Sequence, residues 1–119
     1  MMYVINAFSA NMLAEFPVSV SFTEITAEQA ALELACIEAD GDSWESAVGH
    51  TDTAAVFSAV LSSARQGGGI KVDTRRATVT LNRGDKALLG QYIGPRLPEG
   101  ATVLPEGATI KWLLVEVQP

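Results

Sequence analysis

The sequence predicts an α+β fold, with a single mixed β-sheet of about five strands and two main helices. Three observations predict it: short strand-like segments occur near both ends of the chain, two helix-length segments lie between them, and turn signals separate further strand-like segments in the second half. With 119 residues, the chain is expected to form one domain over residues 1–119 that folds without disulfides.

The first quarter of the chain predicts two strands joined by a polar segment. Residues 3–5 are apolar and are expected to form a short strand. Residues 6–13 are punctuated by polar side chains and are expected to form a loop with one helical turn. Residues 18–22 alternate between apolar and polar side chains, which is typical of a half-buried strand.

Two helices are expected next. Thr26 begins the first, because Gln29 completes a capping box, and this helix is expected to end near Gly41. The second helix is expected from about residue 51 to residue 64. It stops at a glycine-rich segment, residues 66–69, which we interpret as a flexible hairpin or helix exit.

Strand-like segments dominate the second half of the chain, at residues 70–72, 78–81, 87–93 and 110–117. The sequence Asn-Arg-Gly-Asp at residues 82–85 is typical of a hairpin tip. The last segment is almost continuously apolar, which indicates a central strand covered on both faces, with Trp112 in the core.

A pentapeptide occurs twice before the last strand. Pro-Glu-Gly-Ala-Thr stands at residues 98–102 and again at residues 105–109. We expect two consecutive turns, because proline fixes φ and glycine supplies a positive φ. Only the first copy closely follows an arginine, which puts Glu99 near Arg96 in the chain, whereas Glu106 has no such neighbour.

Composition and charge argue against several classes of function. A net charge of −6 disfavours long nucleic acid, although six of the eight cations lie between residues 71 and 96 and could hold a small anion. No apolar run approaches the roughly 20 residues that span a bilayer, and no signal peptide is evident, so no membrane partner is expected. The single cysteine, Cys36, is expected to pack on a helix and favours a cytoplasmic location. No metal site or cofactor is expected, because no ligand cluster has the required spacing.

The only histidine, His50, lies at a predicted turn-to-helix junction. Gly49 precedes it, and Thr51, Asp52 and Thr53 lead into an apolar helix. Free backbone N–H groups and the positive end of the helix dipole collect at such a junction, which suits a phosphate or carboxylate. Histidine is also the side chain that changes charge near neutral pH. The alternative is a histidine that merely neighbours a helix cap.

Several motifs carry a resemblance to a known family. They are Ile-Asn-Ala-Phe-Ser-Ala-Asn-Met-Leu at residues 5–13, Ser-Ala-Val-Gly-His at residues 46–50, and two late segments at residues 85–91 and 96–100. Together they resemble the viral anti-CRISPR ring nucleases, a family first catalogued as a domain of unknown function from archaeal viruses and also found in bacteria and phages. The resemblance covers nearly the whole chain.

The resemblance implies a homodimer with a mixed sheet and an enzyme that needs no metal. Members of that family bind cyclic tetra-adenylate, the second messenger of type III CRISPR systems, in a pocket across the dimer. They cleave it to linear di-adenylates that end in a 2′,3′-cyclic phosphate. The implied partners are therefore cyclic tetra-adenylate and a second copy of the chain, in the cytoplasm of the host cell if the protein is viral.

Carried over residue by residue, the resemblance assigns catalysis to His50 and Glu99. His50 would protonate the leaving 5′-oxygen, and Glu99 would orient His50 or assist removal of the 2′-hydroxyl proton. The implied substrate-binding residues are Arg96, Asn6, Ser9, Asn11, Gln91, Arg76 and Gly49. Residues 38–44 and 67–74 depart from the family pattern in length and composition.

Two other functions stay open on the sequence. The same dimer could bind the cyclic nucleotide without cleaving it, as a sensor or sponge, although the presence of both His50 and Glu99 argues against this. A small protein-interaction or nucleic-acid-binding module is the other. The acidic charge and the scattered aromatic residues argue against it.

Overall fold

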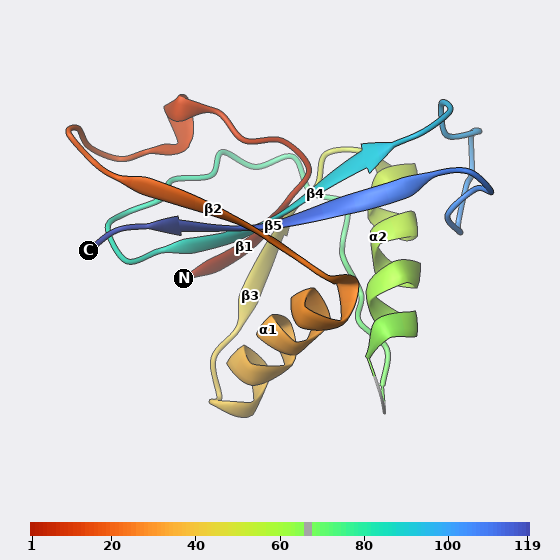
Figure 1. Cartoon of the computed structure of the whole chain (residues 1–119), viewed down its shortest axis with the longest axis horizontal. Coiled ribbons are helices and arrows are strands. Elements are labelled where there is room, and N and C mark those ends of the chain that lie inside the picture. Colours follow the sequence, from red (N-terminus) through yellow and green to blue (C-terminus); the bar gives the residue numbers. More distant parts are fainter. Residues whose placement is uncertain (66–67) are drawn as a thin grey trace.

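The computed structural model describes residues 1–65 and 68–119, and within them it contains a five-stranded mixed sheet, two α-helices and a short 3-10 helix (Figure 1). This confirms the expected fold class. In chain order the elements are β1 (Met2–Ile5), η1 (Ala10–Met12), β2 (Val20–Ile25), α1 (Ala27–Ala39), β3 (Trp44–Ala47), α2 (Thr51–Ala64), β4 (Lys86–Ile93) and β5 (Thr109–Val117).

The order of strands across the sheet is β2-β5-β4-β1-β3. β1 runs parallel to both of its neighbours, and β5 runs antiparallel to β4 and β2. Ile5, the last residue of β1, lies opposite Ala47 at the end of β3 and opposite Leu89 in β4. The carboxyl ends of β1 and β3 therefore meet at one edge of the sheet, and the connection to α2 starts there.

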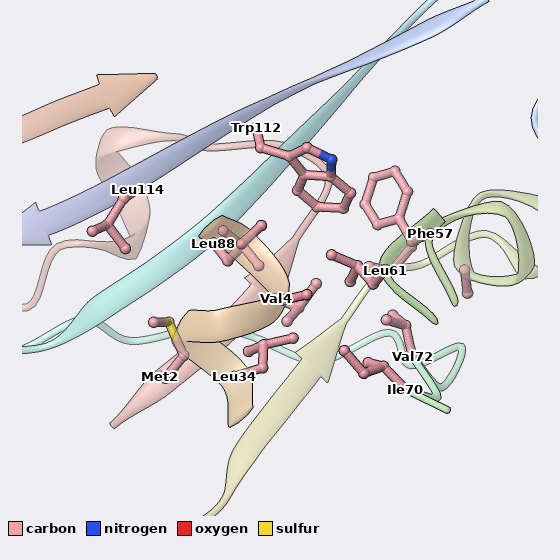
Figure 2. Packing of buried hydrophobic residues seen from close by; sticks show 14 residues of the cluster. Met2, Val4, Leu34, Phe57, Leu61, Ile70, Val72, Leu88, Trp112 and Leu114 are labelled. Carbon is pink, nitrogen blue, oxygen red and sulfur yellow. The ribbon is translucent and has the colours of Figure 1, made fainter. Parts of the chain in front are cut away.

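Both helices pack on the same face of the sheet. Leu34 of α1 and Phe57 of α2 belong to one buried cluster with Val4, Leu88 and Trp112 of the sheet (Figure 2). The rings of Phe57 and Trp112 lie 4.9 Å apart between centroids. This packing explains a glycine in the middle of β4, since a Cβ at that position, residue 90, would lie 2.5 Å from the Phe57 ring.

Irregular segments cover the opposite face. A second cluster joins Ile5, Leu89 and Val115 of the sheet to Leu81, with Met12 of η1 packed against it. The backbone N–H of Leu81 donates to the Met12 carbonyl at 2.6 Å, and the two segments form a single bridge at Leu13. The strand expected at residues 78–81 is therefore wrong: this segment lies over the face of the sheet and is not one of its strands.

The strand expected at residues 70–72 is also wrong, and the cause lies on α2. The Ser58 hydroxyl accepts the N–H of Val72 at 2.8 Å, and the Ser62 hydroxyl accepts the N–H of Ile70 at 2.8 Å. The Ser62 hydroxyl also donates to the Ile70 carbonyl at 3.0 Å, whereas the Ser58 hydroxyl donates to the Ala54 carbonyl of its own helix at 2.8 Å. Ile70 and Val72 are buried, but two serines one helical turn apart take the place of a neighbouring strand.

Other elements follow local signals with small differences. The capping box of Thr26 and Gln29 is present, and α2 covers the predicted residues. The turn at residues 82–85 forms, but it leads into β4 without closing a hairpin. Strand β3 was not expected, and Cys36 is exposed where packing was predicted. The predicted glycine-rich exit includes residues 66–67, which lie outside the described residues.

Candidate functional site

His50 stands at the junction between β3 and α2, where it is itself the N-cap residue. Its backbone is extended, with φ −120° and ψ 128°, and its carbonyl accepts the N–H of Ala54 at 3.0 Å. Its side chain makes no capping hydrogen bond and is exposed. The sequence predicted the turn-to-helix junction, but not that His50 itself is the N-cap residue. The first N–H groups of α2 therefore make no hydrogen bond to a side chain at the N-cap position.

The connection between β4 and β5 returns to this junction. Residues 98–101 form a turn in which the N–H of Ala101 donates to the Pro98 carbonyl at 3.1 Å and Gly100 has a φ of 78°. The N–H of Gly100 donates to Oδ1 of Asp52 at 3.0 Å. Figure 1 shows the same arrangement, with the blue connection beside the yellow-green start of α2. This contact brings the turn that carries Glu99 to the first turn of α2.

A hollow of about 450 Å³ opens at this contact. It is lined by Asp52, Arg96, Leu97, Pro98 and Glu99. Glu99 and Arg96 are both exposed at the wall of this hollow, so a ligand there would meet an exposed anionic and an exposed cationic side chain. A hollow of similar size, about 440 Å³, lies near the opposite ends of the strands beside Met2 and Lys86 and holds none of the predicted site residues.

Arg76 reaches the same junction from the segment that follows α2. Thr74 forms a parallel bridge with Val48, the residue after β3, and the N–H of Arg75 donates to the Val48 carbonyl at 2.9 Å. The next residue then lies beside Gly49, so that Nε of Arg76 donates to the Gly49 carbonyl at 3.3 Å. Arg76, one of the binding residues that the resemblance implies, therefore lies beside Gly49, the residue before His50.

The arginines divide into two groups by their partners. Arg65, Arg75 and Arg83 each form an ion pair with a glutamate, at N–O distances of 3.1, 3.3 and 2.9 Å. Arg76 and Arg96 form no ion pair within residues 1–65 and 68–119. Both lie near the start of α2, so the guanidinium groups left for an external anion gather at the predicted site.

Comparison with known proteins decides the family. A family model described as STIV B116-like matches residues 2–109. The chain belongs to the STIV B116-like family. The structure is similar to that of B116 of Sulfolobus turreted icosahedral virus, with a TM-score of 0.77, 28% sequence identity and coverage of 97% of both chains. No curated protein matches the chain.

The other predicted binding residues of this STIV B116-like chain are divided between two places: Gln91, Ser9 and Asn11 lie on the side of the sheet away from the helices, and Asn6 lies at the strand end beside the start of α2. Gln91 is two residues after Leu89 in β4, so the two lie on the same face of the sheet. This face is covered by the irregular segments and not by the helices. Ser9 caps η1 on that segment, where its hydroxyl accepts the N–H of Asn11 at 3.1 Å. Asn6 follows β1 directly, at the strand end that neighbours Val48 and Gly49.

The start of α2 therefore carries one imidazole, with two guanidinium groups and two carboxylates on the segments around it. Asp52, Arg96 and Glu99 line the hollow, whereas His50 precedes it on the chain and does not line it. Sequence reasoning placed Asp52 only in the helix start and missed its contact, because the partner lies 48 residues further along the chain. Within the described ranges, no three His, Cys, Asp or Glu side chains form a cluster that could hold a metal ion, and no helix is long and apolar enough to cross a membrane. Such a set of groups is suited to holding a phosphate and moving protons around it.

Proposed function

We propose that this STIV B116-like protein is a metal-independent ring nuclease. It binds cyclic tetra-adenylate at the interface of a homodimer and cleaves it to linear di-adenylates with a 2′,3′-cyclic phosphate, which switches off type III CRISPR signalling. The hydrogen bond of 3.0 Å between the Gly100 N–H and Asp52 carries the proposal. It brings the turn of Glu99 to the helix start that His50 caps.

The reaction needs groups that move protons at one phosphate. The 2′-hydroxyl of the ribose attacks the neighbouring phosphorus, a new 2′-oxygen–phosphorus bond forms, and the bond from phosphorus to the 5′-oxygen breaks. His50 gives its proton to the leaving 5′-oxygen, and Glu99 orients His50 or takes the proton of the 2′-hydroxyl. The exposed imidazole, with no capping bond of its own, is available for this role.

Charge stabilisation would come from the arginines and from the helix. Arg96 lines the hollow with Glu99, and Arg76 is held beside His50 through the Gly49 carbonyl. Both can pair with phosphate oxygens in the forked geometry that suits a guanidinium. The backbone N–H groups at the start of α2 add a fixed positive end to the same region.

The symmetry of the ligand fits a dimer. A cyclic tetranucleotide contains a two-fold axis, and a two-fold dimer presents each residue twice. Two copies of His50 could then cut two opposite phosphates and leave two dinucleotides. A ligand that extends from the start of α2 past Asn6 could also reach Ser9, Asn11 and Gln91 on the other side of the sheet.

The direct test is incubation of the purified protein with cyclic tetra-adenylate in EDTA, with the products separated by chromatography. The wild type is expected to give di-adenylate with a cyclic phosphate. His50→Ala should slow cleavage by roughly 10²–10⁴-fold while binding is retained, as for a lost general acid. Wild-type speed in this variant would contradict the assignment of His50.

Binding is tested separately from cleavage. A ring that stays intact but binds tightly to the wild type would support the non-cleaving sensor or sponge in place of the nuclease. An intact ring that does not bind would leave only the shared family and fold.

A further inference from the structure

Asp52 places a negative charge in the first turn of α2, close to where the proposed function puts a phosphate. An acidic residue at a helix start interacts favourably with the helix dipole, but it also repels a bound anion. The Asp52 side chain is only half-buried, yet it has a definite partner: Oδ1 accepts the Gly100 N–H at 3.0 Å. This contact points to a role beyond the helix dipole.

The bonded N–H belongs to the peptide that joins Glu99 to Gly100. The turn itself does not use this N–H, because it is closed by the bond from Ala101 to the Pro98 carbonyl. A φ of 78° at Gly100 belongs to the left-handed region, which glycine adopts without strain. A restraint on this peptide therefore fixes the backbone from which the Glu99 side chain leaves.

The connection between β4 and β5 is also held near its base. The Tyr92 hydroxyl donates to the Pro95 carbonyl at 2.5 Å, and Gly94 packs so closely on Ala108 that an added Cβ would lie 2.7 Å from the Ala108 Cβ. Residues 94–108 contain no helix or strand, and a long connection of this kind is free to move unless its middle is also held. Asp52 holds it at Gly100, well away from the base.

The second pentapeptide provides an internal comparison. Its turn has the same geometry, with the Ala108 N–H donating to the Pro105 carbonyl at 3.1 Å and a φ of 80° at Gly107. In the part of the chain that the structure describes, no side chain accepts the N–H of Gly107. The two glutamates therefore sit on turns that close in the same way. The bond to Asp52, together with the nearby Arg96, distinguishes the turn of Glu99 from that of Glu106.

We propose that Asp52 is a positioning residue for the nuclease reaction, a proposal that rests on the proposed function. Its carboxylate holds the Glu99–Gly100 peptide against the start of α2 and so presents Glu99 and Arg96 to a phosphate bound beside His50. The negative charge itself is not required for this role; the hydrogen-bond acceptor is.

Two variants separate the acceptor from the charge. Asp52→Ala and Asp52→Asn both remove the charge, but only asparagine keeps an oxygen that can accept the Gly100 N–H. We expect Asp52→Ala to lower kcat on cyclic tetra-adenylate by about 10–100-fold, as for a misplaced reacting group, and to speed hydrogen exchange of the Gly100 amide. Asp52→Asn should keep kcat and the slow exchange, and should lower KM because a repulsive charge is gone.

A helix-dipole role alone would affect the two variants alike, so equal kcat values would overturn the proposal, whether both stay at the wild-type value or both fall. If the wild type does not cleave the ring, the proposed function fails. Hydrogen exchange of the Gly100 amide then tests on its own whether Asp52 holds the turn of Glu99. Faster exchange of the Gly100 amide in Asp52→Ala than in Asp52→Asn would support the role of Asp52 in holding the turn, and equal exchange in the two variants would overturn it. Should Asp52→Ala not fold, Asp52→Ser supplies a shorter side chain that still suits a helix start.

Discussion

Ser58 and Ser62 of α2 should stabilise the protein by holding an extended segment that has no strand partner. Their hydroxyls accept the N–H groups of Val72 and Ile70, each at 2.8 Å. We predict that Ser58→Ala and Ser62→Ala each lower the free energy of unfolding. Because the same segment continues to Arg76 beside Gly49, the double variant should also weaken ligand binding at the start of α2.

The magnitude follows from the bonds that are lost. Each substitution leaves one part-buried N–H without its acceptor, which costs about 1–3 kcal/mol. Alanine is a better helix former than serine, and this returns up to about 0.5 kcal/mol. The net loss is therefore about 0.5–3 kcal/mol per site, equivalent to a fall in Tm of roughly 2–12 °C for a chain of this size.

The assay is urea unfolding of the single variants, with amide hydrogen exchange at residues 70 and 72. Ser63→Ala is the matched control, because Ser63 lies on the same helix and is exposed. We expect this control to stay within about 0.5 kcal/mol of the wild type. If Ser58→Ala and Ser62→Ala matched the control in stability and in exchange, the role given to the two hydroxyls would be refuted.

Three further predictions test the core, a helix cap and the anion site. Gly90→Ala should lower the free energy of unfolding by about 1–3 kcal/mol in urea titration, because its Cβ would meet the Phe57 ring at 2.5 Å; a stable variant would contradict the packing. Thr26→Ala should cost about 1 kcal/mol by the same titration, since it removes the capping box of α1. Arg96→Ala should weaken binding of cyclic tetra-adenylate at least about tenfold in calorimetry, which corresponds to about 1.4 kcal/mol. Arg83→Ala should not weaken it, because that arginine is paired with a glutamate; equal affinities for both variants would remove Arg96 from the site.

Local signals predicted the helices well and the sheet only in part. The capping box at Thr26 and the junction at His50 lie within a few residues of the helices that they start, so their effect is visible in the sequence. Strand β3 gave no such signal, because Trp-Glu-Ser-Ala has little apolar alternation and becomes a strand through pairing with β1. Residues 70–72 were predicted as a strand. Their extended backbone bonds to serine hydroxyls of α2 instead, and a short strand-like segment does not reveal whether its partner is a strand or a serine.

The candidate site shows the same difference between features set by local sequence and features set by distant contacts. His50 and Gly49 could be placed from their own neighbourhood, and the turns of the two pentapeptides form as predicted. The contact between Asp52 and Gly100 could not be predicted from local sequence, because it depends on how a long connection folds back over the start of α2. The position of Gln91 on the face opposite the helices also depends on the register of β4 in the sheet, which no local pattern specifies.

The two pentapeptide turns allow a direct test of whether the turn bonded to Asp52 supplies the glutamate of a ring nuclease at His50. The measurement is the rate of cyclic tetra-adenylate cleavage in EDTA by the wild type, Glu99→Gln and Glu106→Gln. Both glutamates are exposed on turns of the same geometry, but only the turn of Glu99 is bonded to Asp52 and lines the hollow with Arg96, so Glu106→Gln serves as the control. We expect the wild type to cleave the ring. The rate should be lower by about 10²-fold or more in Glu99→Gln and unchanged in Glu106→Gln. Equal rates in the two variants, or no cleavage by the wild type, would contradict this expectation.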